Sequence, residues 1–416
     1  MGRPLNIWLV QTGEVLPLDR TARLMRTGMI ADMLAERGHA VLWWTSSFDH
    51  FSKSWHPHAD ERVDVGKNLS LFFLKGTGYR GNKSIERFRD HRIVAAKFAR
   101  FSRLQPRPDI IVASLPPHDI AGAAARFAED SGVPLIVDVR DPWPDVFIEQ
   151  FPPPVRAVAR LILNREYRIA AGAIRRADAV FSVNQRLLRW ALSLAGRAAK
   201  ADDAVFPLGA KPLSRAARPD IGEQIASVPG STDKAWIVLY AGTISRPYHD
   251  PSVLLDAARA MRNVSGIRFI IAGDGALLSE LRKRAGDLHN VLFTGWMNQD
   301  ELAVLYRAAR IGVCPSQTEL EIPTNKMYAY LSAGLPVLTS FGGETRRILE
   351  ERRAGFFFPP NAADALVRII SRLHDDEELL KTTSRRAKKL FEEQYSADTI
   401  YGRFADVIEK IAGCRS

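Results

Sequence analysis

The side chains with the clearest chemical potential in this chain are its cations. Lys and Arg number 58 against 47 Asp and Glu, which gives a net charge of +11. A positive excess of this size predicts attraction to a polyanion, such as nucleic acid, anionic lipid or a sugar phosphate. The excess is concentrated in segment 75–107, which holds ten Lys and Arg residues against only Glu86 and Asp90. Anion binding is therefore the first chemistry that the residue types predict.

Apolar residues recur among the cations in two stretches, from about Ser84 to Leu104 and from Arg156 to Arg176. Both patterns are typical of a basic amphipathic helix. Each basic residue held near an anionic leaflet contributes about 1 kcal/mol, so segments 75–107 and 156–176 are candidates for binding an anionic membrane surface. The alternative for each stretch is a solvated helix face whose apolar side packs in the core. Nucleic acid is not expected as a partner, because no zinc finger, helix-turn-helix or RNP-like motif accompanies the charge.

The two cysteines argue against a fold held together by disulfides or by zinc. Cys314 and Cys414 are a hundred residues apart and lack CxxC or CxxH spacing, so neither a disulfide framework nor a zinc cluster is expected. A reducing compartment fits this composition. No apolar run approaches the roughly 18 residues of a membrane-spanning helix. The first run, 7–10, is interrupted by Gln11 and Gly13, which favours a buried strand over a signal peptide.

The elements that must position these residues form two series of short apolar runs that alternate with helical patterns. This alternation predicts parallel sheets flanked by helices. The expected strands are 6–10, 40–45, 69–74, 110–114, 135–139 and 179–183 in the first series, and 236–240, 268–272, 291–294, 311–314, 336–339 and 355–358 in the second. Helices such as 277–284 and 300–309 lie between strands of the second series. The Pro- and Gly-rich stretch 210–232 has the composition of a linker.

We therefore predict an α/β protein with two Rossmann-like, doubly wound domains that face each other across a cleft. The first domain spans 1–209, and a C-terminal helix at 397–416 is expected to pack back on it. The second spans 210–396. Doubly wound sheets bind ligands at the carboxyl ends of their strands, so the cleft is the expected site.

Four sequence pieces, in order, carry a family resemblance. They read YAGT at 240–243, IAGDG at 271–275, NVLFTGW at 290–296 and PTNKMYAYLSAGLPV at 323–337. Together they resemble the donor-binding domain of retaining glycosyltransferases of family 4, which have the two-domain GT-B architecture. In the first half, RGHAVLWWTSSFDH at 37–50 and VRDPWP at 139–144 resemble a branch that builds bacterial surface polysaccharides, including amino-sugar transferases of O-antigen and capsule assembly.

The resemblance implies transfer of a hexosyl or N-acetylhexosaminyl group from a nucleotide diphosphate donor, with a UDP-sugar favoured. The acceptor is a lipid-linked glycan or polysaccharide, and the first domain is expected to bind it. The nucleotide sugar is a substrate, so no cofactor and no metal are expected. The expected location is cytoplasmic, peripheral at the inner face of the cytoplasmic membrane.

The donor site that the resemblance implies lies in the second domain. Arg246, in the turn after the first strand, is the candidate cation for the diphosphate, and Lys326 is a second one unless it merely faces solvent. The family usually has an arginine where this chain has Thr243. Trp296 either stacks on the base or packs at a strand end. The implied donor-binding residues are Gly242, Thr243, Arg246, Gly273, Asp274, Gly275, Trp296, Glu319, Glu321, Asn325 and Lys326.

The family's pair of glutamates is incomplete in this chain. Counting back from Gly334 places the first at Glu321, for which Glu319 is a nearby rival, and the second at Ala329. The resemblance assigns Glu321 to the donor sugar, whereas an alanine accepts no hydrogen bond from ribose. Tyr328 and Asn325 are possible substitutes. The implied catalytic residues are His118, Glu321 and Arg246.

On the acceptor side, the candidates are His50, Arg140, Asp141 and Arg20. Arg140 is expected to contact an acceptor pyrophosphate, or else to form an internal ion pair with Asp141 or Asp145. Two other functions stay open: a nucleotide-sugar 2-epimerase of similar architecture, and a non-catalytic partner in a glycan synthase complex, which the missing glutamate would fit.

Overall fold

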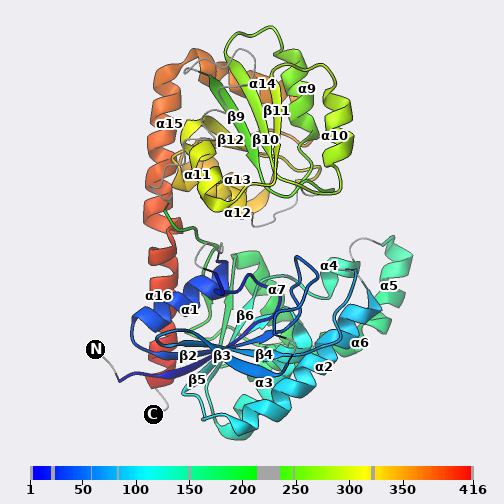
Figure 1. Ribbon diagram of the computed structural model, residues 1–416, viewed down its shortest axis with the longest axis vertical. Coiled ribbons are helices and arrows are strands. Elements are labelled where there is room, and N and C mark those ends of the chain that lie inside the picture. The colour runs from blue at the N-terminus through cyan, green and yellow to red at the C-terminus, as the bar shows by residue number, and fades with distance from the viewer. Residues whose placement is uncertain are drawn as a thin grey trace. The chain divides into compact units, whose positions relative to one another are not determined.

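The computed structural model describes residues 3–19, 24–57, 59–81, 84–148, 151–212, 235–246, 249–319 and 324–413. The chain divides into two compact units (Figure 1). Unit 1 comprises Met1–Pro207 and Ile400–Ser416, and unit 2 comprises Leu208–Thr399. Most of the expected linker 210–232 lies outside the described residues.

The described part of unit 1 contains an eight-stranded sheet in the order β3-β4-β2-β1-β5-β6-β7-β8. All neighbours pair in parallel except β3, which is antiparallel to β4. The six expected strands are confirmed, because each is a buried apolar run. The strands are β1 (Asn6–Val10), β2 (Ala40–Ser46), β3 (Glu61–Gly66), β4 (Leu69–Leu74), β5 (Ile110–Leu115), β6 (Leu135–Val139), β7 (Ala179–Ser182) and β8 (Ala204–Val205).

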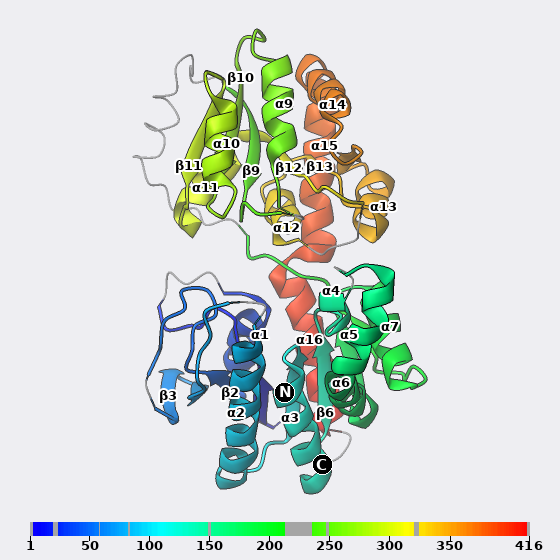
Figure 2. The ribbon, with the colours of Figure 1, turned by 90° about the vertical axis from the view of Figure 1, so that its right-hand side faces the viewer.

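Helices cover both faces of this sheet. The helices are α1 (Arg26–Glu36), α2 (Ile85–Phe101), α3 (His118–Ser131), α4 (Asp145–Ile148), α5 (Pro153–Ile162), α6 (Asn164–Arg176), α7 (Gln185–Ala195) and α16 (Ala397–Gly413). A 3-10 turn, Ser102–Leu104, continues α2. Helices α2, α3, α6 and α7 pack side by side (Figure 2).

The C-terminal helix α16 is held on unit 1 by aromatic and ionic contacts. The ring of Phe404 lies 4.7 Å from that of Phe181 on β7 and 4.9 Å from that of Phe206. Arg37, at the end of α1, pairs with Asp406 and Glu409 at 2.7 and 2.8 Å. The last helix thus completes the core of unit 1.

The described part of unit 2 contains a six-stranded, all-parallel sheet in the order β11-β10-β9-β12-β13-β14. Its strands are β9 (Trp236–Ala241), β10 (Ile267–Ala272), β11 (Val291–Gly295), β12 (Ala309–Cys314), β13 (Val337–Thr339) and β14 (Gly355–Phe357). Its helices are α9 (Ser252–Ala260), α10 (Leu278–Ala285), α11 (Gln299–Ala308), α12 (Asn325–Ser332), α13 (Gly343–Glu351), α14 (Ala363–Asp375) and α15 (Glu377–Leu390), followed by a π-helical turn, Phe391–Tyr395.

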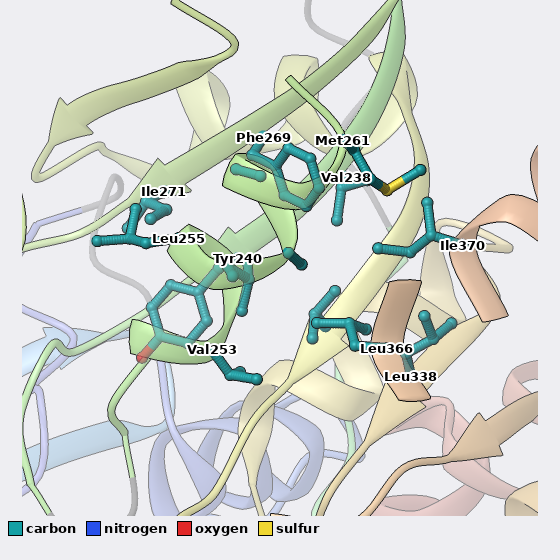
Figure 3. Packing of buried hydrophobic residues seen from close by; sticks show 14 of the residues in the cluster. Val238, Tyr240, Val253, Leu255, Met261, Phe269, Ile271, Leu338, Leu366 and Ile370 are labelled. Atoms are coloured by element: carbon teal, nitrogen blue, oxygen red, sulfur yellow. The ribbon is translucent and has the colours of Figure 1, made fainter. Parts of the chain in front are cut away.

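The core of unit 2 lies between the sheet and helices α9 and α14 (Figure 3). Val238 and Phe269 from the strands meet Leu255 from α9 and Leu366 and Ile370 from α14. Burying a side chain of this size stabilises the fold by about 1.5–3 kcal/mol.

Both sheets have a point at which the strand order reverses. In unit 1, β1 lies between β2 and β5, and in unit 2, β9 lies between β10 and β12. Ligands of open parallel sheets bind beside such a point, at the carboxyl ends of the strands. The residues that follow β1 and β9 are therefore where a site is expected in each unit.

Candidate functional site

Three glycines join the turns that follow β9 and β10. Gly242, Gly273 and Gly275 have φ values of 148°, 141° and 151°, which a residue with a side chain rarely adopts. A Cβ at position 273 would lie 1.9 Å from the carbonyl oxygen of Gly242, and one at position 275 would lie 2.2 Å from that of Ile244. Glycine is therefore required at these positions for the two turns to pack backbone against backbone.

Lys326 crosses the first of these glycines. It is the second residue of α12, and its Cε would lie 2.2 Å from a Cβ at position 242. Its Nζ lies 3.0 Å from Nδ1 of His249 and 4.9 Å from the centre of the Tyr240 ring. The hydroxyl of Tyr240 points out of the core cluster and donates to the carbonyl oxygens of Thr243 and His249 (Figure 3).

The charge of Lys326 is held away from bulk water. The side chain is half-buried, and burial lowers its pKa to about 8. Among the described residues, no carboxylate lies within ion-pair distance of its ammonium group. The interpretation as a merely solvent-facing lysine is therefore wrong, and the geometry is that of a cation available to an anion.

Arg246 lies on the same turn but is engaged. Its Nε donates to the buried Asp250 at 3.1 Å, and its guanidinium pairs with the exposed Glu280 at 2.6 Å. Asp250 also accepts from Gln317 at 2.7 Å and from the backbone N–H of Ser252 at 2.9 Å. The buried carboxylate thus fixes the turn, while Glu280 occupies the outer side of the guanidinium.

The remaining donor-side candidates are mostly exposed. Thr243, Asp274 and Glu319 face solvent, and so does Asn325, the first residue of α12. Trp296 is 74 % exposed, which rules out the alternative of a packing tryptophan. These residues border the carboxyl edge of the sheet, and their roles stay predictions.

The structure describes only one of the two positions at which the family has a glutamate, Ala329. Glu321 lies outside the described residues. Ala329 is buried on α12, and so is the neighbouring Tyr328, whose ring lies 5.0 Å from that of Tyr395. Tyr328 is therefore directed into the packing of unit 2 rather than toward a ligand, whereas Asn325 is exposed.

In unit 1, a network of buried ion pairs joins the loop after β1 and the start of α1 to the end of β6. Arg26 forms a bidentate pair with Asp138 on β6, at 2.8 and 2.9 Å. Arg140 donates to Asp138 at 2.9 Å, to Glu14 and to the hydroxyl of Thr27 at 2.9 Å. Arg140 thus forms internal ion pairs, as one of the two predictions held. Its partners are Asp138 and Glu14, however, and the predicted partners Asp141 and Asp145 were wrong.

This arrangement leaves Arg140 little freedom to bind an acceptor. Its side chain is 12 % exposed and all three of its nitrogen atoms donate within unit 1. Asp141 is exposed at the carboxyl end of β6. Arg20 lies outside the described residues.

A second cluster in unit 1 combines cations with aromatic rings. Nδ1 of His50 lies 2.7 Å from the hydroxyl of Tyr79, whose ring faces Lys53 and Arg87. Arg87 also lies 4.6 Å from the centre of the Trp143 ring. Burial and these two cations lower the pKa of His50 to about 4, so His50 is neutral at pH 7.

His118 opens α3 beside this cluster. Its imidazole is fully buried, with Phe88 and Trp143 as ring neighbours and Asp119 at 3.5 Å. Burial lowers its pKa. In this structure the imidazole does not reach solvent, so its predicted catalytic role stays a prediction.

Sequence reasoning missed His249, Asp250, Tyr79 and Arg87. None of them carries a local signal, because each becomes relevant only through contacts with distant segments. Asp138 did carry one: a charged residue inside an apolar strand must be paired when buried, and Arg140 follows it closely.

Two further findings concern the described residues only. They contain no helix long and apolar enough to cross a bilayer. They also contain no cluster of three His, Cys, Asp or Glu side chains arranged to hold a metal ion.

Each of the two units matches a known protein family. Residues 25–209 match the model of the glycosyl transferase 4-like domain, and residues 235–376 match that of glycosyl transferases group 1. The O-antigen chain mannosyltransferase C of Escherichia coli is 28% identical over 43% of this chain and 47% of its own length. The amylovoran biosynthesis glycosyltransferase AmsK of Erwinia amylovora is 27% identical over 38% of this chain and 41% of its own. The chain thus spans less than half the length of these relatives.

Solved structures match over nearly the whole chain. The crystal structure of Anabaena HepE in complex with UDP and glucose has a TM-score of 0.67 at 16% identity, covering 98% of this chain and 100% of that one. The lipopolysaccharide glycosyltransferase WaaG has a TM-score of 0.63 at 16% identity, covering 97% and 99%. The expected pair of doubly wound domains is confirmed, and the chain belongs to the GT-B glycosyltransferases that join a glycosyl transferase 4-like domain to a group 1 domain.

Proposed function

We propose that the protein transfers a sugar, with retention, from a nucleotide diphosphate donor to a lipid-linked or polysaccharide acceptor in bacterial surface-glycan synthesis. A UDP-sugar is the favoured donor. The names of the relatives, which refer to O-antigen and amylovoran, support the pathway class. The fold shared with HepE, whose structure holds UDP and glucose, supports the donor class.

The observation that carries the proposal is the position of Lys326. A nucleotide diphosphate leaves as an anion, so a transferase must stabilise negative charge at the breaking bond. Lys326 holds an ammonium group at the carboxyl end of β9, over Gly242, whose lack of a Cβ leaves room for the lysine side chain. It also stands in the first turn of α12, where the helix dipole favours an anion.

The residues around Lys326 complete a diphosphate site. Gly242 and Thr243 border it from the turn after β9, and Gly273, Asp274 and Gly275 from the turn after β10. Arg246 reaches the phosphates after exchanging Glu280 for the ligand. Trp296 offers an exposed ring on which a base can stack.

Catalysis then depends on groups that the resemblance assigns. The resemblance assigns Glu321, with Glu319 as its rival, to the donor sugar, and His118 to the acceptor side. The acceptor is held by unit 1, where the cations Lys53 and Arg87 lie over aromatic rings beside the neutral His50, an arrangement suited to a sugar phosphate. We place the protein in the cytoplasm, peripheral at the inner face of the cytoplasmic membrane, where a lipid-linked acceptor is presented.

A thermal-shift screen with UDP, GDP, ADP and their sugar conjugates tests the proposal, because a ligand that binds the folded protein raises its melting temperature. We expect UDP species to raise it, and Lys326→Met to abolish the shift. Lys389→Met removes an exposed lysine from α15 and serves as the control.

The screen also separates the alternatives. Absence of a shift with every nucleotide, in isothermal titration as well, would favour a non-catalytic partner. Conversion of the donor to an epimerised sugar nucleotide without any acceptor would favour a 2-epimerase. Acceptor-dependent release of UDP, with the anomeric configuration kept in the product, is the expected result.

A further inference from the structure

Helix α5 (Pro153–Ile162) contacts α4 and α6 but leaves most of its apolar face exposed. Every residue of α5 is exposed except Ala159. Val155, Val158, Leu161 and Ile162 are 44 %, 58 %, 74 % and 73 % exposed, and Phe151, just before the helix, is 45 % exposed. Five of the eleven large apolar residues that are exposed in the described part of the chain thus fall within twelve positions.

The exposed residues share one side of the helix. Val155, Val158 and Ile162 follow each other at spacings of three and four, and Leu161 flanks them, so they form a single apolar stripe. Arg156 and Arg160 lie on the other side. Such a helix is stable in water only if its stripe is covered, because isolated short helices gain most of their stability from packing.

The charge around α5 is almost entirely positive. Segment 151–176 contains six arginines and one acidic residue, Glu166. Glu166 is buried and already paired with Arg92 and Arg165, at 3.3 and 3.1 Å. Arg160, Arg165 and Arg176 also approach carboxylates outside the segment, Asp145, Asp119 and Glu129, at 3.9, 2.9 and 2.6 Å. Arginine still exceeds acidic residues within the segment, which favours an anionic layer.

The other basic segment, 75–107, differs in where its apolar residues lie. Helix α2 buries Val94 and Phe98 in the core of unit 1. Its exposed apolar residue Ile85 lies at the first position of the helix, and the next apolar residue on that face, Phe88, is partly buried against His118 and Phe147. On α2, Ile85 is the only large apolar residue that is exposed, so this helix offers no apolar stripe like that of α5. Binding of segment 75–107 to an anionic membrane surface stays a prediction.

We propose that α5 lies in the plane of an anionic bilayer surface, with its apolar stripe inserted at the boundary between headgroups and acyl chains. Arg156 and Arg160 then meet the lipid phosphates. The proposal names the helix that would hold the protein at the membrane. It rests on the proposed function, because a lipid-linked acceptor is the reason for the protein to bind a membrane.

A lipid surface fits this helix better than a second protein does. A stable protein interface buries roughly 1,200–2,000 Å² and draws on many elements. Here the exposed apolar residues are concentrated on one helix of three turns, which projects from unit 1 beside α4 and α6 (Figure 1). A short helix with one apolar side and one arginine side is the pattern of an interfacial anchor.

Vesicle flotation with the full-length protein tests the proposal. Vesicles of phosphatidylcholine mixed with phosphatidylglycerol are compared with vesicles of phosphatidylcholine alone. We expect the Leu161→Ser/Ile162→Ser variant to lower the partition coefficient on anionic vesicles at least about tenfold. Ile85→Ser, which removes an even more exposed apolar side chain from α2, is the control and is expected to leave the partition coefficient unchanged.

The arginines are tested in the same assay. Arg156→Gln/Arg160→Gln is expected to weaken binding by about thirtyfold on anionic vesicles only, since each cation near an anionic leaflet strengthens binding about fivefold. Arg89→Gln/Arg100→Gln, two exposed positions of α2, is the control and should have a smaller effect.

Three results would overturn the proposal. The first is no vesicle binding by the wild type. The second is binding that the α5 variants leave intact. The third is a wild-type dimer, seen by light scattering, that Leu161→Ser/Ile162→Ser dissociates, which would make the stripe a protein interface. The UDP-induced thermal shift is measured on every variant, so a failure of donor binding is recorded independently of membrane binding.

Discussion

The ammonium group of Lys326 lies 3.0 Å from Nδ1 of His249. When the lysine is protonated, it donates to this nitrogen, so Nε2 of His249 carries the proton of the neutral ring. The contact joins α12 to the turn after β9, and it holds the lysine over Gly242. A flexible cation is thereby fixed at the place where a diphosphate is expected.

Donor binding should depend on the protonation of Lys326. Burial lowers its pKa to about 8, so the free protein loses this charge as the pH rises above that value. A bound diphosphate stabilises the ammonium form and raises its pKa, and binding above pH 8 therefore takes up a proton. We expect the affinity for UDP to fall by about tenfold between pH 7 and pH 9.

Isothermal titration across this range, in two buffers of different ionisation enthalpy, measures both the affinity and the proton uptake. The phosphate itself titrates near pH 6, outside the window. Lys326→Met is expected to bind weakly, with an affinity that does not change over this interval. An unchanged wild-type affinity at pH 9 would show that the lysine does not contact the ligand.

The contact between the two glycine turns gives a prediction about stability. Gly273→Ala places a Cβ 1.9 Å from the carbonyl oxygen of Gly242, so the turn after β9 must move. We expect a loss of UDP binding together with a clear drop in the melting temperature. Gly266→Ala is the control: its φ of 82° is also one that alanine rarely adopts, but nothing lies within 4 Å of the new Cβ.

Gly266→Ala should cost only the left-handed conformation, about 1–2 kcal/mol, and leave UDP affinity unchanged. Circular dichroism on heating and titration with UDP compare the two variants. Equal effects of the two substitutions on UDP affinity would contradict the role given to the backbone contact.

The Arg26–Asp138 pair should be a major determinant of unit 1 stability. Their side chains are 2 % and 0 % exposed, and Asp138 also accepts from Arg140. Asp138→Ala leaves two guanidinium groups without this counterion, so we expect a loss of about 3–5 kcal/mol. Urea unfolding followed by tryptophan fluorescence reports mainly on unit 1, which contains six of the eight tryptophans.

The control is Glu129→Ala, which breaks the exposed pair with Arg176 in the same unit. Exposed pairs contribute up to about 1 kcal/mol, so this variant should unfold close to the wild type. Similar unfolding midpoints for Asp138→Ala and Glu129→Ala would show that the network does not stabilise the unit.

Most of the sheet framework could be predicted from sequence, because strands buried on both faces read as apolar runs. Strand β1 was predicted residue for residue at Asn6–Val10. Strand β3 was missed because its sequence ERVDVG alternates charged and apolar residues at the edge of the sheet, where polar residues are common. The two-residue strand β8 is too short to give a pattern.

The site was less accessible to sequence reasoning, because its contacts join distant segments. Lys326 and His249 are 77 positions apart, and Arg26 and Asp138 are 112 apart. The glycine turns could be placed because they follow recognisable strands. It could not be predicted that Arg246 pairs with carboxylates whereas Lys326 does not, because this depends on the side chains that folding brings beside each of them.

Arg246 provides the last prediction, in which two partners of one ion pair change donor affinity in opposite directions. In the structure Glu280 holds the guanidinium at 2.6 Å, and we expect it to compete with a diphosphate for this group. We expect Arg246→Ala to weaken UDP binding. Glu280→Gln should strengthen it by about threefold, because the pair is exposed and its attraction is screened by water. Glu378→Gln, which breaks a comparable exposed pair with Arg385 on α15, is the control. Titration with UDP at low ionic strength gives the largest contrast. A decrease in affinity for Glu280→Gln would mean that Glu280 orients Arg246 for the ligand rather than competing with it.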